Sequence, residues 1–207
     1  MTNGPIHVVD YGAGNIGSVL NMIKRVGGQA LSTGDARVLS AATKILLPGV
    51  GSFDNAVQKL QRLGLVEVLR ERAAAGIPFL GICLGMQLLA SGSEEGALPG
   101  LDLISGTVRK FSLDASHTSL KIPHMGWNLI RHVKDSRLTA GLDDRSRFYF
   151  VHSYHYECTN AADRLLETHH GYVFTSGVER GNVMGVQFHP EKSHRYGMQL
   201  IKNFVEL

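Results

Sequence analysis

Clusters of basic residues and long apolar runs are both missing from this 207-residue sequence. The formal net charge is only +3, and lysine and arginine never gather into a long run, so no basic arm for nucleic acid is present. No apolar stretch is long enough for a membrane span, and no basic segment leads into an apolar one near Met1. We therefore expect a soluble, cytoplasmic protein that binds neither nucleic acid nor membranes.

Cysteine is also scarce, because Cys83 and Cys158 are the only two. A chain of this length with 43% hydrophobic residues can bury an adequate core without a disulfide. The ten histidines form no H-E-x-x-H motif, and His152 and His155 are expected on opposite faces of one strand because they are three residues apart. We therefore predict no metal site and no cofactor.

Short apolar runs alternate with helical periodicity in the first hundred residues, which predicts three strands that are each followed by a helix. The strands are expected at 6–9, 44–47 and 77–82, and the helices begin near Asn15, Phe53 and Leu84. The helical pattern after Phe53 continues through Leu69. This order predicts an α/β fold of three layers, in which a mostly parallel central sheet is flanked by helices.

The second half of the sequence is rich in strand-like segments. They lie at 101–108, 148–151, 172–175 and 183–188. A last helix carries Leu200 and Phe204 on its inner side. We expect an antiparallel extension of the sheet, and because no linker rich in Pro, Gly or Ser interrupts the chain, residues 1–207 are expected to form a single domain.

Residues 12–17 form a G-x-G-x-x-G motif between the first strand and the first helix, and Asp35 follows at a plausible distance. Such glycines allow the backbone to approach a pyrophosphate, so a dinucleotide site is one hypothesis. Because the chain has 24 glycines, such a motif can arise by coincidence, and an ordinary tight turn between strand and helix is the alternative that we favour. A P-loop is excluded because no G-x-x-x-x-G-K-[ST] occurs.

Residues 81–85 read Gly-Ile-Cys-Leu-Gly, which is the thiol version of the G-x-S-x-G nucleophile elbow. The flanking glycines relieve crowding where an apolar strand turns sharply into a helix. The start of the helix favours a thiolate at Cys83, and the amide of Leu84 would point toward a developing oxyanion. A buried structural cysteine is the alternative, and Cys158 is assigned to packing because it lacks such surroundings.

A thiol nucleophile needs a base and a group that orients the base. His189 ends an apolar run, and Glu191 lies two residues further, on the same side of an extended backbone. The pair predicts a general base whose tautomer is fixed by a carboxylate.

Residues 48–51, Pro-Gly-Val-Gly, follow the strand that precedes the elbow strand in the sequence. Because the carboxyl ends of parallel strands meet at one edge of a sheet, we expect this loop beside Cys83. The two glycines around Val50 would let its peptide unit reorient, so its amide is a candidate for the oxyanion hole. An ordinary turn is the alternative.

Several segments together resemble class I, triad-type glutamine amidotransferases. The elbow GICLGMQ at 81–87 and FHPE at 188–191 carry the resemblance. Four further segments narrow the resemblance to the branch that supplies glutaminase subunits of imidazole glycerol phosphate synthases. They are DYGAGN (10–15), PGVGSF (48–53), PHMGWN (123–128) and FVHSY (150–154). The resemblance covers almost the whole chain and implies that residues 12–17 bind no dinucleotide.

The resemblance assigns catalytic roles to Cys83, His189 and Glu191, in the order nucleophile, proton relay and orienting group. The oxyanion hole would be formed by the amides of Val50 and Leu84. The residues implied to hold glutamine are Gly49, Gly51, Gln87, Glu95, Ser153 and Tyr154. Those implied to contact a partner subunit, or to gate the route toward it, are Asn15, Trp127, Tyr149 and Lys192.

The implied partner is a cyclase subunit with a (β/α)8 barrel, which forms a heterodimer with this chain, receives the ammonia and makes imidazole glycerol phosphate and aminoimidazole carboxamide ribotide. The amidotransferases of anthranilate, aminodeoxychorismate or guanylate synthesis are alternatives that share the elbow and the His-Pro-Glu sequence. A nucleotide-binding module and a scaffold protein without activity are two further hypotheses. The presence of Cys83, His189 and Glu191 together argues against the scaffold.

Overall fold

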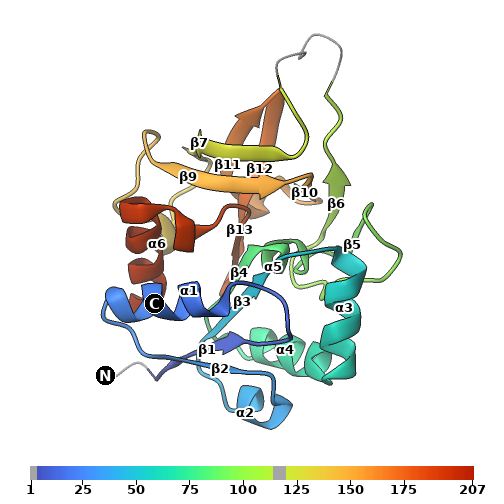
Figure 1. Cartoon of the computed structure of the whole chain (residues 1–207), viewed down its shortest axis with the longest axis vertical. Coiled ribbons are helices and arrows are strands. Elements are labelled where there is room, and N and C mark those ends of the chain that lie inside the picture. The colour runs from blue at the N-terminus through green and yellow to red at the C-terminus, as the bar shows by residue number, and fades with distance from the viewer. Residues whose placement is uncertain (1–3, 114–119) are drawn as a thin grey trace.

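The computed structural model describes residues 4–113 and 120–207, and its largest feature is a mixed β-sheet (Figure 1). Parallel strands form one half of the sheet, in the order β2, β1, β3, β4, β13. They are β1 (Ile6–Val9), β2 (Ala30–Thr33), β3 (Ile45–Gly49), β4 (Phe79–Cys83) and β13 (Val183–Val186). The predicted parallel sheet is thus confirmed, with β4 between β3 and β13.

Helices cover both faces of this parallel half. They are α1 (Ile16–Arg25), α2 (Ala36–Ser40), α3 (Phe53–Arg62), α4 (Leu65–Ala74), α5 (Leu84–Gln87) and α6 (His194–Glu206). Alternate strand positions face opposite sides, so Leu46 and Leu80 join the core under α1 and α6, whereas Leu47 and Phe79 join the core under α3 and α4. The predicted three layers follow from this alternation.

The antiparallel extension continues the sheet beyond β13. It contains β12 (Tyr172–Arg180), β10 (Tyr154–Cys158) and β6 (Gly106–Lys110), with β11 (Arg164–His170) pairing both β12 and β8 (Arg131–His132). At its edge the short strand β5 (Gly92–Ser93) pairs with β6 in parallel. A separate antiparallel ribbon joins β7 (His124–Leu129) to β9 (Arg147–His152). Single 3-10 turns lie at Arg137–Thr139, Ala161–Asp163 and Pro190–Lys192.

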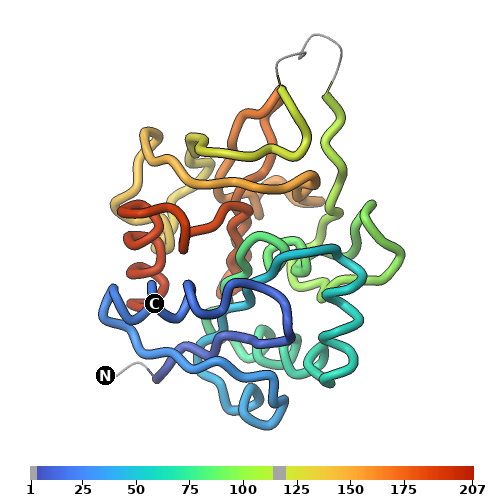
Figure 2. The backbone as a smooth tube through the Cα atoms, in the orientation of Figure 1, coloured from blue at the N-terminus to red at the C-terminus, as the bar shows by residue number. Residues whose placement is uncertain are grey.

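The C-terminal segment returns to the middle of the molecule, between the N-terminal half and the strands of the extension (Figure 2). Its strand β13 runs parallel to β4, with Val186 opposite Ile82. Residues that follow β13 therefore emerge at the same edge of the sheet as Cys83, although about a hundred positions separate them in the sequence.

Some local expectations are wrong for identifiable reasons. The helix expected from Phe53 through Leu69 is divided into α3 and α4, because Gly64 adopts a left-handed φ of 65° between them. The helix after Cys83 is a single turn, and the strand expected at 101–108 begins only at Gly106. Both differences have one cause: the amides of residues 101–104 donate hydrogen bonds to the carbonyls of residues 88–90, which ends the helix and occupies the segment.

The expected opposition of His152 and His155 is also wrong. His152 ends β9 and His155 lies in β10, so Ser153 separates two different strands. Both imidazole rings pack against Phe111, at centroid distances of 5.2 and 4.8 Å. The alternation rule fails here because it holds only within a continuous strand.

Candidate active site

Cys83 occupies a strained turn between β4 and α5. Its φ of 55° and ψ of −112° are rare for any residue except glycine. Glycines on either side make the turn possible, since a Cβ on Gly85 would lie 1.8 Å from the carbonyl oxygen of Leu47, and one on Gly81 would lie 2.6 Å from that of Gly85. The predicted elbow geometry is confirmed. However, α5 is only one turn long, so the dipole of a long helix, which the sequence pattern suggested beside the thiol, is absent.

His189 and Glu191 form a buried pair immediately after β13. Nδ1 of His189 lies 2.7 Å from Oε1 of Glu191, and the two side chains are 3% and 5% exposed. Burial lowers the pKa of His189, but hydrogen bonding and charge from Cys83 and Glu191 outweigh burial and raise the pKa to about 10. The imidazole is therefore cationic at neutral pH, between a carboxylate and the sulfur.

The Cys83 sulfur and the His189 imidazole face the same cavity, which has a volume of about 360 Å³. Nε2 of His189 has no hydrogen-bond partner in the part of the chain that the structure describes, and Cys83 is one of the groups that raise the pKa of this imidazole. The cavity is lined by Val50, Gly51, Cys83, Leu84, Gln87, Glu95, Pro123, Val151, His152, Ser153, Tyr154 and His189. The structure thus brings the predicted catalytic residues together with most of the predicted glutamine-binding residues.

Residues 48–51 lie beside the elbow, as the sequence predicts, and Pro48 and Gly49 are the last two residues of β3. Gly49 is paired with Cys83 across β3 and β4, so the next residue, Val50, lines the cavity together with Leu84. The hydroxyl of Tyr11 donates a hydrogen bond of 3.0 Å to the carbonyl of Pro48 and fixes the start of the loop. Burial, and secondarily the charge of Cys83, raise the pKa of Tyr11, which keeps this hydroxyl protonated as a donor.

Glu95 is fixed by the start of a helix. Its Oε2 accepts a hydrogen bond of 2.9 Å from the amide of Phe53, the first residue of α3. This contact holds the carboxylate at the cavity wall.

Gln87 is held mainly by the protein itself. Its Nε2 donates to the carbonyl of Tyr154 at 3.2 Å and to Oε1 of Gln187 at 3.0 Å. Both amide hydrogens are therefore engaged, and the carbonyl oxygen of this side chain is the part left for a ligand. Gln187 is fully buried, and its Nε2 lies 3.8 Å from the Cys83 sulfur. Sequence reasoning missed Gln187, although its position two residues before His189 in an extended segment was a usable signal.

The predicted partner-facing residues, apart from Asn15, lie on and beside the β7–β9 ribbon. Trp127 is 44% exposed and stands opposite Tyr149, with ring centroids 6.2 Å apart. Lys192 places its ammonium 5.5 Å from the Tyr149 ring. Asn15 instead caps α1, where its side-chain oxygen accepts from the amide of Ser18 at 3.4 Å.

Exposed apolar side chains extend this surface. Met125, Trp127 and Leu129 alternate along β7 and project to one side, and all three are exposed. Contiguous exposed apolar side chains are a common feature of interaction surfaces. We call these three residues the β7 stripe; sequence reasoning identified only Trp127.

The glycine motif at 12–17 is part of the packing around the loop at 48–51. A Cβ on Gly14 would lie 3.4 Å from Pro48, and the carbonyl of Gly12 accepts a hydrogen bond from Lys59. Asp35 caps α2 and pairs with Arg37. These contacts give both features structural roles.

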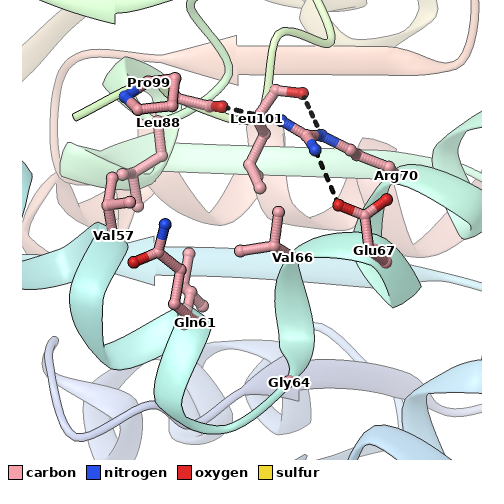
Figure 3. A pocket seen from close by; sticks show the side chains of 11 residues that line it. Val57, Gln61, Gly64, Val66, Glu67, Arg70, Leu88, Pro99 and Leu101 are labelled. Carbon is pink, nitrogen blue, oxygen red and sulfur yellow. Dashed lines mark hydrogen bonds and ion pairs between the residues drawn. The ribbon is translucent and has the colours of Figure 1, made fainter.

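A second cavity, of about 300 Å³, lies between α3, α4 and the segment at 99–101 (Figure 3). It shares no lining residue with the Cys83 cavity. Arg70 is its main charged group, but the guanidinium is engaged by Glu67 and by the carbonyls of Gly100 and Leu101. This cavity contains no nucleophile and no unpaired charge among its described residues.

Within residues 4–113 and 120–207, His, Cys, Asp and Glu side chains form no cluster of three or more suited to a metal ion. No helix in these ranges is long and apolar enough to cross a membrane. Cys83 and Cys158 are both free thiols. Burial, followed by the charge of Asp163, raises the pKa of Cys158 to about 12, so that this thiol stays protonated and suits the predicted packing role.

An elbow cysteine that shares a cavity with a histidine and its carboxylate partner is typical of a cysteine-dependent acyl-transfer enzyme. The model of the family "Glutamine amidotransferase class-I" matches residues 7–207. The chain belongs to the class I glutamine amidotransferase family and is an enzyme of that class.

Curated relatives are similar in sequence to this chain over nearly their full length. The chain is 47% identical to "Imidazole glycerol phosphate synthase subunit HisH 2" of Methanococcus maripaludis, over 97% of this chain and 98% of that protein. It is 48% identical to the protein of the same name from Pseudomonas aeruginosa, over 98% and 99%.

Solved structures share the fold at low sequence identity. "Structure of PurLQS from Thermotoga maritima" has a TM-score of 0.74 at 18% identity, covering 99% of this chain and 98% of that chain. A glutamine amidotransferase from Thermotoga maritima has a TM-score of 0.66 at 18% identity, covering 95% and 80%.

Proposed function

We propose that this chain hydrolyses glutamine to glutamate and ammonia as the glutaminase subunit of an imidazole glycerol phosphate synthase, in histidine biosynthesis. The observation that carries the proposal is the meeting of the strained elbow cysteine and the buried His189–Glu191 pair in one cavity. The names of the relatives from M. maripaludis and P. aeruginosa support the choice of synthase.

In the first half-reaction, the thiolate of Cys83 attacks the side-chain carbonyl carbon of glutamine and forms a carbon–sulfur bond. The negative charge that develops on oxygen is stabilised by the amides of Leu84 and Val50. The His189 imidazolium, which the raised pKa makes available at neutral pH, gives its proton to the amide nitrogen. The carbon–nitrogen bond then breaks, ammonia leaves, and a γ-glutamyl thioester remains on Cys83.

In the second half-reaction, neutral His189 takes a proton from water, which attacks the thioester carbon. The carbon–sulfur bond breaks, glutamate leaves, and the thiolate and imidazolium are restored. The side chain of Glu191 accepts a hydrogen bond from Nδ1 of His189 and stabilises the imidazolium each time it forms. Gly49, Gly51, Gln87, Glu95, Ser153 and Tyr154 are proposed to hold glutamine, with Glu95 facing its ammonium group.

We further propose a cyclase partner with a (β/α)8 barrel that forms a heterodimer with this chain, receives the ammonia and makes imidazole glycerol phosphate and aminoimidazole carboxamide ribotide. Ammonia released to water would be lost, which is the chemical reason to expect a partner. The β7 stripe supports this, and Trp127, Tyr149, Lys192 and Asn15 are proposed contacts or gates. We place the chain in the cytoplasm as a single domain.

The test combines the purified chain with the cyclase subunit from the same genome and measures glutamate release. We expect a stable complex that hydrolyses glutamine, loss of turnover in Cys83→Ser and retained turnover in Cys158→Ser, with unchanged thermal unfolding midpoints. Turnover by the Cys83→Ser complex would refute the chemistry. Failure to bind the cyclase, with binding instead to a synthase of anthranilate, aminodeoxychorismate or guanylate, would refute the pathway.

A further inference from the structure

Gln187 faces the reacting sulfur with an orientation that the surrounding hydrogen bonds fix. The residue is fully buried, and its Nε2 is 3.8 Å from Sγ of Cys83. A glutamine amide can present either a donor or an acceptor to a neighbour, and only the donor favours a thiolate. The question is therefore which end of the amide is held toward the sulfur.

The carbonyl of Tyr154 determines the answer, because a carbonyl only accepts hydrogen bonds. The group of Gln87 that lies 3.2 Å from this carbonyl must be the NH2. The same NH2 lies 3.0 Å from the Gln187 side chain, which must present its oxygen there. The remaining end of the Gln187 amide, its NH2, is then directed at Cys83.

A histidine chain holds the Tyr154 carbonyl in place. Nδ1 of His152 donates to it at 2.7 Å, and burial lowers the pKa of His152 well below its ordinary value, so the ring is neutral. Its Nε2 consequently accepts, and Nδ1 of His124 donates to it at 3.0 Å.

The other end of this series of hydrogen bonds, at Asn128, independently gives the same donors and acceptors. The Asn128 amide donates to the carbonyl of His169 at 2.8 Å and accepts from the amide of Leu129 at 2.8 Å, which fixes its orientation. Its NH2 therefore faces Nε2 of His124 at 3.1 Å, and neutral His124 must carry its proton on Nδ1. The backbone carbonyls of Tyr154 and His169, at opposite ends of this series of hydrogen bonds, thus require the same assignment of donors and acceptors.

We propose that Gln187 is a further catalytic residue, which donates a hydrogen bond to the Cys83 sulfur and stabilises its thiolate before and after the thioester forms. Gln87, the Tyr154 carbonyl and His152 act as positioning groups that keep the NH2 of Gln187 turned toward the sulfur. Being neutral, the amide supplies this donor without a charge that would compete with the His189 imidazolium. The inference deepens the proposed function and rests on it.

The experiment measures the rate at which iodoacetamide alkylates Cys83 in the full chain, followed by mass spectrometry of the Cys83 peptide. A Cys158→Ser background leaves one cysteine. Gln187→Glu replaces the donor by an oxygen of the same size, and Gln187→Met removes it. Ser176→Ala is the matched control, because Ser176 is equally buried and its carbonyl accepts a hydrogen bond of 2.9 Å from the backbone N–H of Gln187. Its side chain is bonded to Thr168 and not to Gln187 or Cys83.

We expect alkylation at pH 7 to slow by about tenfold or more in Gln187→Glu and by about threefold or more in Gln187→Met, since a hydrogen bond to a charged group is lost. Ser176→Ala should stay within about twofold of the parent, and Gln187→Met should regain the parent rate at pH 9.5, because access to the thiol is unchanged.

Parental rates at pH 7 in both Gln187 variants, an equal loss in Ser176→Ala, or a deficit that persists at pH 9.5 would each overturn the inference. Alkylation does not require glutamine hydrolysis. A parent chain that shows the expected alkylation pattern but releases no glutamate with its partner would contradict the proposed function and leave the thiol contact intact.

Discussion

The carboxylate of Glu191 meets Nδ1 of His189 at 2.7 Å, in a position where both side chains are almost completely buried. This contact leaves Nε2 as the only imidazole nitrogen free to exchange protons at the cavity. It also fixes the tautomer, because a carboxylate accepts and Nδ1 must donate. The consequences for activity can be measured directly.

Replacing Glu191 by glutamine should lower kcat for glutamine hydrolysis by about a hundredfold or more while KM changes little, because the imidazolium loses its counter-charge and its fixed orientation. Glu206→Gln, an exposed change on α6, should retain full activity. Glutamate release at saturating glutamine checks both. More than half of the original kcat in Glu191→Gln would show that the carboxylate has no catalytic part.

Tyr11→Phe removes the hydrogen bond that anchors the carbonyl of Pro48. The loss of one buried hydrogen bond should lower the free energy of unfolding by about 1 kcal/mol. Because Val50 follows this anchor, we also expect kcat to fall about tenfold. Tyr196→Phe is the control, because among the described residues the Tyr196 hydroxyl has a hydrogen bond only from exposed Arg195. Unchanged kcat in Tyr11→Phe would separate the anchor from the oxyanion hole.

Trp127→Ala should weaken association with the cyclase subunit by about 2 kcal/mol or more, as expected for an exposed aromatic residue within an interface. Calorimetric titration of one subunit into the other measures the change. Val173→Ala removes an equally exposed apolar side chain from β12, outside the stripe, and should leave affinity unchanged. Equal effects of the two substitutions would argue against the β7 stripe as the docking surface.

Stability should decrease in mild acid because of His124. Burial, followed by the charge of His170, lowers the pKa of His124 from 6.5 to about 4. Between these values the unfolded chain binds a proton that the folded chain excludes, so stability is lost as pH falls from 6.5 toward 4. The shift corresponds to about 3 kcal/mol.

Urea unfolding at pH 7 and pH 4.5 measures this loss. His124→Phe keeps a ring between Phe150 and His170 but cannot bind a proton, so its unfolding free energy should fall less than that of the parent. His169→Phe, at an exposed position, should follow the parent. Identical pH dependence in all three proteins would assign the acid sensitivity to other groups.

The features that sequence predicts well are those encoded by neighbours in the chain. The elbow follows from Gly81 and Gly85, whose absent side chains avoid contacts that a Cβ could not tolerate. The His189–Glu191 pair follows from a spacing of two residues. The parallel sheet follows from the alternation of apolar runs with helical periodicity, and its register then brings Gly49 beside Cys83.

The features that sequence reasoning missed depend on distant partners. The length of α5 is set by the amides of residues 101–104, which no local pattern reveals. Gln187 becomes a thiol donor only because Gln87, a hundred positions away, is itself turned by the Tyr154 carbonyl. The orientation of an amide is a property of the whole network, so residue type and spacing alone could not predict it.

The most direct test of Cys83 as the nucleophile is to quench the complex with acid during turnover of glutamine and to analyse the cysteine-containing peptides by mass spectrometry. We expect the mass of one γ-glutamyl group on the peptide that carries Cys83, and its accumulation when hydrolysis of the thioester is slowed. Turnover with no adduct on Cys83, or with the adduct on Cys158, would contradict the assignment of the elbow thiol as the nucleophile.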